Sequence, residues 1–159
     1  MSNFYPLKIK EIIRETSQAV SLSFDIPENL KEEFQFKAGQ YITIKYDAEN
    51  GEIRRAYSLC SAPASEDFKV TVKEVEGGSF SVIANNKLTA GDILEVHPPE
   101  GKFLFEPGNS ANDYAAFAAG SGITPVLSII KSVLEQELES RFVLTYGNKS
   151  VDDTIFFKE

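Results

Sequence analysis

The sequence predicts an all-β, antiparallel Greek-key barrel of six strands in residues 1–107, followed in residues 108–159 by the first part of an α/β domain. Two observations support this prediction. Between residues 20 and 96, short segments alternate apolar and polar residues and are separated by turn residues, as in small antiparallel barrels. From Tyr114 onward, a continuous apolar run is followed by apolar residues at helical spacing.

The alternating segments are the expected barrel strands. Residues 20–26 place Val, Leu, Phe and Ile on one side and polar residues on the other, which is typical of a half-buried strand. Residues 41–46 and 68–73 alternate in the same way, and residues 93–96 add a short apolar run. The segment 55–58 is compatible with an edge strand. Turns are expected at Pro27-Glu28-Asn29, Asn50-Gly51, Gly77-Gly78, Gly91-Asp92 and Pro98-Pro99.

The α/β part begins after a polar linker at residues 108–113. Residues 114–119 are expected to form a parallel strand covered on both faces, and residues 142–146 a second buried strand. Between them, apolar residues recur at helical spacing after Pro125, at Val126, Leu127, Ile129, Ile130, Val133, Leu134 and Leu138. The unit is therefore expected to be strand–helix–strand.

Another helix is expected to start at residues 152–154, with Ile155, Phe156 and Phe157 on its apolar face. The sequence ends after about one turn of it, so we expect a truncated domain. Such a domain would be less stable than the barrel, or would self-associate through an exposed strand edge.

Composition excludes several classes of partner and site. The net charge of -8 argues against nucleic acid as a partner. The single cysteine, Cys60, excludes an internal disulfide and a Cys-ligated cluster, and the single histidine, His97, argues against zinc, so no metal is expected. No signal segment or run of about 20 apolar residues is present, so a cytoplasmic protein without membrane contact is expected.

Several of these residues have an unremarkable interpretation. Cys60 is expected to be a small buried apolar residue and His97 to be exposed. The acidic residues Glu135, Glu137 and Glu139 are expected on a solvated helix face.

Three residues of one segment have side chains suited to an anionic flavin nucleotide. The guanidinium of Arg55 can bind phosphates, the phenol of Tyr57 can lie along a flat ring, and the hydroxyl of Ser58 can bond a ring nitrogen. Arg55 and Tyr57 share one side of a strand, and Ser58 faces the other unless the strand twists or bulges. The alternative is an edge strand with an exposed arginine and a packed tyrosine.

Two glycine-containing segments predict anion sites. Gly77 and Gly78 precede Ser79, the expected N-cap of a short helix; the alternative is a hairpin turn with an ordinary cap. The turn Gly120-Ser121-Gly122-Ile123-Thr124-Pro125 follows an apolar strand and opens a helix, which is the context of a dinucleotide-binding turn. It lacks the third glycine of the usual fingerprint, and a plain tight turn is the alternative.

Taken together, these motifs resemble the ferredoxin–NADP reductase superfamily, and within it the reductase components of multicomponent oxygenases, such as phenylacetyl-CoA oxygenase reductases. The likeness covers essentially the whole chain. Arg55-Ala56-Tyr57-Ser58 resembles its flavin motif, and Gly91-Asp92 with residues 99–103 resembles the end of its barrel. The other matching positions are Val72, Lys73, Gly78, Ser79, Phe80 and Ser81 for the second flavin segment, Gly120, Ser121, Gly122, Thr124 and Pro125 for the nicotinamide-nucleotide turn, and Tyr146, Gly147, Asn148 and Lys149 for the end of the second strand.

The resemblance implies FAD as cofactor, NADH or NADPH as hydride donor, and a redox partner protein, either a ferredoxin domain or an oxygenase component. A [2Fe–2S] cluster is implied only if a further C-terminal domain exists. Arg55 would bind the FAD phosphates and Tyr57 the ring and ribityl region. Ser58 and Thr124 would be catalytic, Ser58 at the flavin nitrogen that takes hydride and Thr124 near flavin and nicotinamide. Lys149 stands where many relatives have arginine, which leaves the choice between NADH and NADPH as hydride donor open. A reductase of free flavin and a non-enzymatic docking module are the alternatives.

Overall fold

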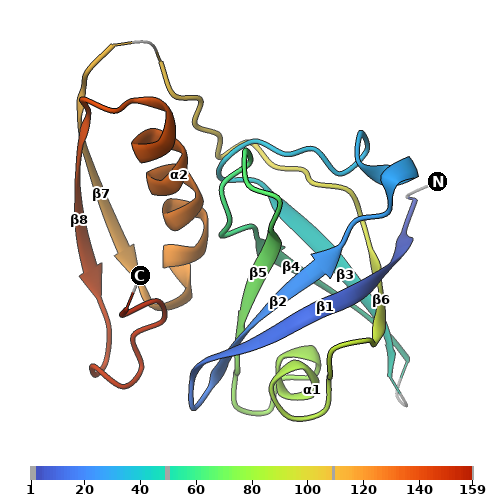
Figure 1. The fold of residues 1–159 in the computed structure, drawn as a ribbon. Coiled ribbons are helices and arrows are strands. Elements are labelled where there is room, and N and C mark those ends of the chain that lie inside the picture. The colour runs from blue at the N-terminus through green and yellow to red at the C-terminus, as the bar shows by residue number, and fades with distance from the viewer. Residues whose placement is uncertain (1–2, 49–50, 109, 159) are drawn as a thin grey trace.

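The computed structural model describes residues 3–48, 51–108 and 110–158, and Asn50 of an expected turn and Asn109 of the expected linker lie outside them. Figure 1 shows a β-barrel beside a smaller α/β unit, with the helix of that unit between its strands and the barrel. The elements are β1 Tyr5–Thr16, β2 Ala19–Asp25, η1 Glu28–Leu30, β3 Tyr41–Ala48, β4 Gly51–Ser58, β5 Phe68–Lys73, α1 Phe80–Asn86, β6 Ile93–Val96, β7 Asp113–Ala119, η2 Gly120–Gly122, α2 Ile123–Gln136 and β8 Arg141–Gly147.

The barrel is one antiparallel sheet of six strands in the order β4-β3-β6-β1-β2-β5. This confirms the predicted fold class. The sheet is not fully closed: after β4 the chain meets β5 at an isolated bridge between Leu59 and Val70. Buried residues from β1, β2, β3, β5, β6 and α1 form the core, among them Leu22, Ile44 and Phe80, and half-buried residues of β4 pack against it. The open seam between β4 and β5 is therefore the place where the barrel wall is discontinuous.

Strand β1 was not expected, and its register explains why. Its pairing with β2 shifts between Ile9 and Glu11 and again between Arg14 and Thr16. Each shift breaks the alternation on which the strand prediction depended. Leu7 and Ile9 are fully buried, whereas Ile12 and Ile13 are only half-buried.

In the α/β unit, β7 and β8 pair in parallel, and α2 packs Val126, Ile129 and Val133 inward. The expectation that both strands are covered on two faces is wrong for this structure. Phe117 is 81% exposed and Val143 52% exposed. The reason is that α2 covers one face, and the other face has no element over it within the part of the chain that the structure describes.

The expected C-terminal helix is absent from residues 150–158, which form successive turns. Phe156 has φ 61°, a left-handed conformation that a right-handed helix does not accommodate. The segment folds back so that Ile155 is fully buried against Ala19 of β2 and Ile123 of α2. The segment thus buries one side chain, that of Ile155, instead of the apolar face of a helix. Phe157, which was expected on that face, is 67% exposed.

Glu137, just after α2, connects the linker to the α/β unit. Its carboxylate accepts hydrogen bonds from the Gly108 amide at 2.6 Å, from the Tyr114 hydroxyl at 2.9 Å and from the Ser140 hydroxyl. The side chain is buried, so the expectation of a solvated position is wrong for this residue. The Ser140 bond, followed by those from Gly108 and Tyr114, holds the pKa of Glu137 below its ordinary value. No helix among the described residues is long and apolar enough to cross a membrane.

Candidate functional site: a cleft between the barrel and the α/β unit

A cleft of about 500 Å³ lies where the open seam of the barrel meets the start of α2. Four segments supply its walls: β4, β5, the loop before α1, and the turn before α2. The lining residues are Arg55, Ala56, Tyr57, Ser58, Thr71, Lys73, Val75, Gly78, Ser79, Phe80, Ser81, Ser121, Gly122, Thr124 and Pro125. None of these described lining residues is acidic, although the chain carries a net charge of -8. The cleft is a local basic and hydroxyl-rich surface in an acidic protein.

Arg55 joins the two predicted flavin segments. One guanidinium nitrogen donates to the carbonyl of Arg54 at 2.8 Å, and the other donates to the hydroxyl of Ser79 at 3.3 Å. The side chain is otherwise exposed to the cleft. Because Arg55 and Ser79 are 24 positions apart, this contact depends on the sheet placing β4 beside the loop before α1. A phosphate entering here would meet one guanidinium and one hydroxyl together.

Tyr57 provides an aromatic wall. Its ring lies 5.8 Å from that of Phe80, centroid to centroid, at an interplanar angle of 43°. Burial raises the pKa of Tyr57 to about 12, and the positive charge of Arg55 opposes part of this increase. The phenol is therefore neutral at ordinary pH and can donate a hydrogen bond.

Ser58 also lines the cleft, together with Arg55, Ala56 and Tyr57. Strict alternation along β4 would have turned Ser58 to the opposite side from Tyr57. The end of β4, where the chain leaves the sheet for the Leu59 bridge, brings all four residues to one cavity. All four residues of the predicted flavin motif therefore line the same cleft.

The loop before α1 is held tightly. Gly78 is tightly enclosed, since a Cβ there would lie 2.5 Å from the Ser81 hydroxyl and 2.8 Å from the Val75 carbonyl. The Ser81 hydroxyl is buried and accepts from the Val75 amide at 3.2 Å, so it holds the loop rather than facing open space. Ser79 occupies the predicted cap position but makes no side-chain cap bond, and its hydroxyl accepts from Arg55 instead.

Of the strand residues in the second flavin segment, only one presents a side chain to the cleft. Lys73 lines the cavity, and its ammonium donates to the Asp153 carbonyl at 3.4 Å. Val72 is fully buried in the barrel core. Phe80 lies at the cleft wall as well as in the core.

The predicted dinucleotide turn forms η2 and the first turn of α2. Gly120 has φ +50°, a conformation that favours glycine, and the Thr124 hydroxyl donates to the Ser121 carbonyl at 3.0 Å. Apart from residues adjacent in the chain, no protein atom lies within 4 Å of the position that a Cβ of Gly122 would take. Ser121, Gly122, Thr124 and Pro125 line the cleft, whereas Gly120 lies behind them.

The second-strand motif supports this turn from the side. The Tyr146 hydroxyl donates to the Gly120 carbonyl at 2.9 Å, and burial raises the pKa of Tyr146. Gly147, Asn148 and Lys149 follow and are not among the cleft-lining residues. Among the described residues, the Asn148 side-chain oxygen is buried without a hydrogen-bond partner.

Sequence reasoning missed Thr71, Val75 and Ala56 as cleft residues. Thr71 alternates with the buried Val70 and Val72, and this pattern places it on the outer side of β5 without indicating that a cavity lies there. Its neighbour Lys73, on the same side of the strand, was the available signal.

Comparison with known proteins identifies the fold and its parts. Residues 6–105 match the oxidoreductase FAD-binding domain family. The chain belongs to this family. Residues 117–159 match the oxidoreductase NAD-binding domain. The predicted resemblance to FAD- and nicotinamide-dependent reductases is thereby confirmed.

Two curated relatives illustrate the match. One of the subunits of 1,2-phenylacetyl-CoA epoxidase from Escherichia coli (strain K12) is 40% identical over 157 residues, which are 98% of this chain and 44% of that protein. The ferredoxin reductase component of 3-ketosteroid-9-alpha-monooxygenase from Rhodococcus rhodochrous is 37% identical over 155 residues, 96% of this chain and 43% of that protein. The chain spans less than half the length of these relatives.

Comparison with solved structures also finds reductases. Phthalate dioxygenase reductase superposes with a TM-score of 0.81 at 27% identity, over 98% of this chain and 47% of that one. A ferredoxin NADP+ reductase from Neisseria gonorrhoeae, solved with FAD and NADP, gives 0.79 at 24% identity, over 99% of this chain and 63% of that one. The second likeness concerns the fold alone.

The cleft fits the chemistry of FAD. Its two cations suit a pyrophosphate, its tyrosine suits a flat ring, and its hydroxyls suit a ribityl chain and ring heteroatoms. A carboxylate, which would repel the phosphates, is absent from the described lining. The volume of about 500 Å³ lies within the roughly 300–1,000 Å³ that is usual for cofactor clefts.

Proposed function

We propose that this chain binds FAD and a nicotinamide nucleotide in a reductase that carries electrons from NADH or NADPH to a redox partner protein. The observation that supports this most directly is the composition of the cleft. It joins Arg55 and Ser79 of the flavin segments to Gly122 and Thr124 of the dinucleotide turn. Hydride transfer requires the two cofactors to meet, and this cleft has walls from both segments.

On the flavin side, Arg55 and Lys73 hold the anionic phosphates, with the Ser79 hydroxyl fixed by Arg55. Tyr57, as a neutral phenol, packs along the ring region and donates a hydrogen bond. Ser58 places a hydroxyl at the ring nitrogen that accepts hydride. Bound FAD supplies the chemistry, because it accepts a two-electron hydride and can return electrons singly.

On the nicotinamide side, Gly122 leaves open space through which a pyrophosphate approaches the start of α2. Gly120 and Ser121 shape that turn, Pro125 lies in the first turn of the helix, and Thr124 lies between the two walls. Tyr146 holds the turn in place, and Gly147, Asn148 and Lys149 follow it directly in the chain.

The relatives supply the partner class, since one is a component of an epoxidase and the other is the ferredoxin reductase component of a monooxygenase. We place this chain in a corresponding role, with an iron–sulfur protein, a ferredoxin domain or an oxygenase component as acceptor. The composition supports a cytoplasmic setting. The exposed apolar side chains of β7 and β8 support self-association as a further property.

The first experiment tests FAD binding through Arg55. Arg55→Ala should weaken FAD binding by about 1.5–3 kcal/mol, which is the contribution of a hydrogen bond to a charged group. Titration of the flavin-free protein with FAD measures this change. Arg54→Ala is the matched control, because the Arg54 guanidinium bonds Glu52 and lies over the Phe4 ring instead of lining the cleft. The wild-type chain should also prefer FAD to FMN, and equal or tighter FMN binding would contradict the assignment.

A further inference from the structure

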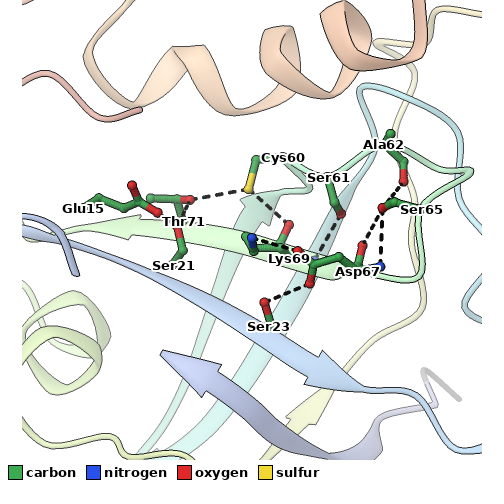
Figure 2. A network of polar contacts seen from close by, with 10 residues as sticks. All are labelled: Glu15, Ser21, Ser23, Cys60, Ser61, Ala62, Ser65, Asp67, Lys69 and Thr71. Carbon is green, nitrogen blue, oxygen red and sulfur yellow. Dashed lines mark hydrogen bonds and ion pairs between the residues drawn. The ribbon is translucent and has the colours of Figure 1, made fainter. Parts of the chain in front are cut away.

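The floor of the cleft contains a threonine that belongs to a row of hydrogen-bonded side chains. Thr71 lines the cleft and is only 3% exposed. Its hydroxyl oxygen lies 2.7 Å from that of Ser21, and the Ser21 oxygen lies 2.5 Å from a carboxylate oxygen of Glu15. Figure 2 shows Glu15, Ser21 and Thr71 together; Ser23 of β2 bonds Asp67, just before β5, rather than any of these three residues.

The direction of these hydrogen bonds follows from counting hydrogens. A hydroxyl has one hydrogen to donate, and an ionised carboxylate only accepts. The Ser21 hydrogen is therefore donated to Glu15, and the Ser21 oxygen accepts the hydrogen of Thr71. The Thr71 hydrogen is consequently directed towards Ser21, which is not among the cleft-lining residues.

Cys60, the other neighbour of the Thr71 hydroxyl, does not change the direction of these hydrogen bonds. The Cys60 thiol donates to the Lys69 carbonyl at 3.4 Å, and its sulfur lies 3.5 Å from the Thr71 oxygen. A thiol is a weak donor and a weak acceptor, so it does not compete with Ser21 for the threonine hydrogen. Thr71, a residue of the cleft lining, therefore has a hydroxyl oxygen that can accept a further hydrogen bond but has no hydrogen left to donate.

We infer that Thr71 is a further cofactor-contacting residue that accepts an N–H from the flavin ring, with Glu15 and Ser21 as the positioning residues that fix its orientation. This inference rests on the proposed FAD site. The oxidised flavin ring has one N–H, at N3, and its other exposed heteroatoms accept hydrogen bonds. An acceptor-only group at the cleft floor therefore favours the edge of the ring that carries N3.

The test compares FAD with 3-methyl-FAD, in which a methyl group replaces the N3 hydrogen. The dissociation constants of both are measured by flavin fluorescence with the flavin-free wild type and with Thr71→Val, which keeps the shape and removes the hydroxyl. Wild type should bind 3-methyl-FAD about 3–10-fold more weakly than FAD, as expected for one lost neutral hydrogen bond. In Thr71→Val this ratio should shrink towards 1, because FAD itself has lost its acceptor.

Further variants separate orientation from folding. Ser21→Ala should also reduce the ratio, since Thr71 is then free to turn its hydrogen into the cleft. Thr71→Ser should restore the wild-type ratio, and Ser23→Ala, which disrupts the separate bond to Asp67, should leave it unchanged. A wild-type ratio in Thr71→Val would overturn the inference while leaving FAD binding intact. Failure of the wild type to bind FAD at all would instead refute the proposed function.

Discussion

Tyr57 illustrates how one side chain in the cleft responds to two opposing effects. Burial of the ring disfavours the phenolate, while the neighbouring Arg55 charge favours it, and the net result is a pKa of about 12. Since the ordinary value is 10.0, the folded protein retains this proton over a pH range in which the unfolded chain loses it. Tyr57 therefore stabilises the folded state fully below the unfolded-state value.

The pH dependence of stability follows from that difference. As pH rises from about 10 to about 12, the contribution of Tyr57 should disappear, and the free energy of unfolding should fall. Denaturant unfolding of wild type and Tyr57→Phe at several alkaline pH values measures this. The variant should show a shallower decline over that interval, and parallel curves would show that Tyr57 is not the titrating group. Arg55→Ala, which removes the opposing charge, should move the Tyr57 ultraviolet titration to higher pH.

At the scale of elements, the two glycine-containing turns of the cleft have different structural requirements. Gly78 is surrounded by the Ser81 hydroxyl and the Val75 carbonyl, whereas Gly122 faces open space with an ordinary negative φ of -63°. A methyl group at Gly78 must push the loop apart, whereas at Gly122, a cleft-lining residue, it meets no neighbouring segment of the protein. We therefore predict that Gly78 is needed for the fold and Gly122 for ligand binding.

The matched pair Gly78→Ala and Gly122→Ala tests this distinction. Gly78→Ala should lower the melting temperature, because the Cβ would lie closer to its neighbours than atoms tolerate. Gly122→Ala should keep or slightly raise the melting temperature, since alanine favours a helix start, yet weaken NADH or NADPH binding severalfold. The contrary pattern, with Gly122→Ala unfolding the protein at unchanged affinity, would assign that turn a purely structural role.

Local patterns were sufficient for most elements, and the exceptions have physical causes. Alternation predicted β2, β3 and β5, and a short apolar run predicted β6, but the two register shifts hid β1. The helix expected after Thr154 failed because burying Ile155 required a left-handed Phe156. Side-chain type predicted Arg55 and Ser79 as cleft residues; by contrast, the buried position of Glu137 and the hydroxyl row at Thr71 depend on segments distant in sequence.

At the scale of the whole molecule, the barrel and the α/β unit differ in how much of their sheets is buried. All residues of β2 except Asp25 are buried, whereas five of the seven residues of β8 are exposed. The two parts are joined by the Ile155 contact with Ala19 and by the Ser128 hydroxyl, which donates to the Ser61 carbonyl at 2.7 Å. Local opening should therefore begin in the α/β unit.

Hydrogen exchange measures this difference. Amides of β8 should exchange earlier than those of β2 and β5, because their hydrogen bonds lie in a two-stranded sheet with one open face. Strand β4 is the control, since its side chains are also exposed but it is the edge of the six-stranded sheet. If β4 exchanged as early as β8, the position of a strand at a sheet edge would explain the result. Equal protection of β2 and β8 in a dilute monomer would contradict the prediction that the α/β unit opens first.

We expect the seam between β4 and β5 to couple the supply of cofactor to the solubility of newly made protein. Its two sides, carrying Tyr57 and Thr71, are the free edges of the barrel and also walls of the cleft. A ligand that spans them stabilises the folded state by about 1.4 kcal/mol for each tenfold excess over its dissociation constant. Without it, these strand edges are templates for pairing with other chains. Cells short of riboflavin should therefore accumulate this protein in insoluble form, and adding the vitamin during expression should raise the soluble yield.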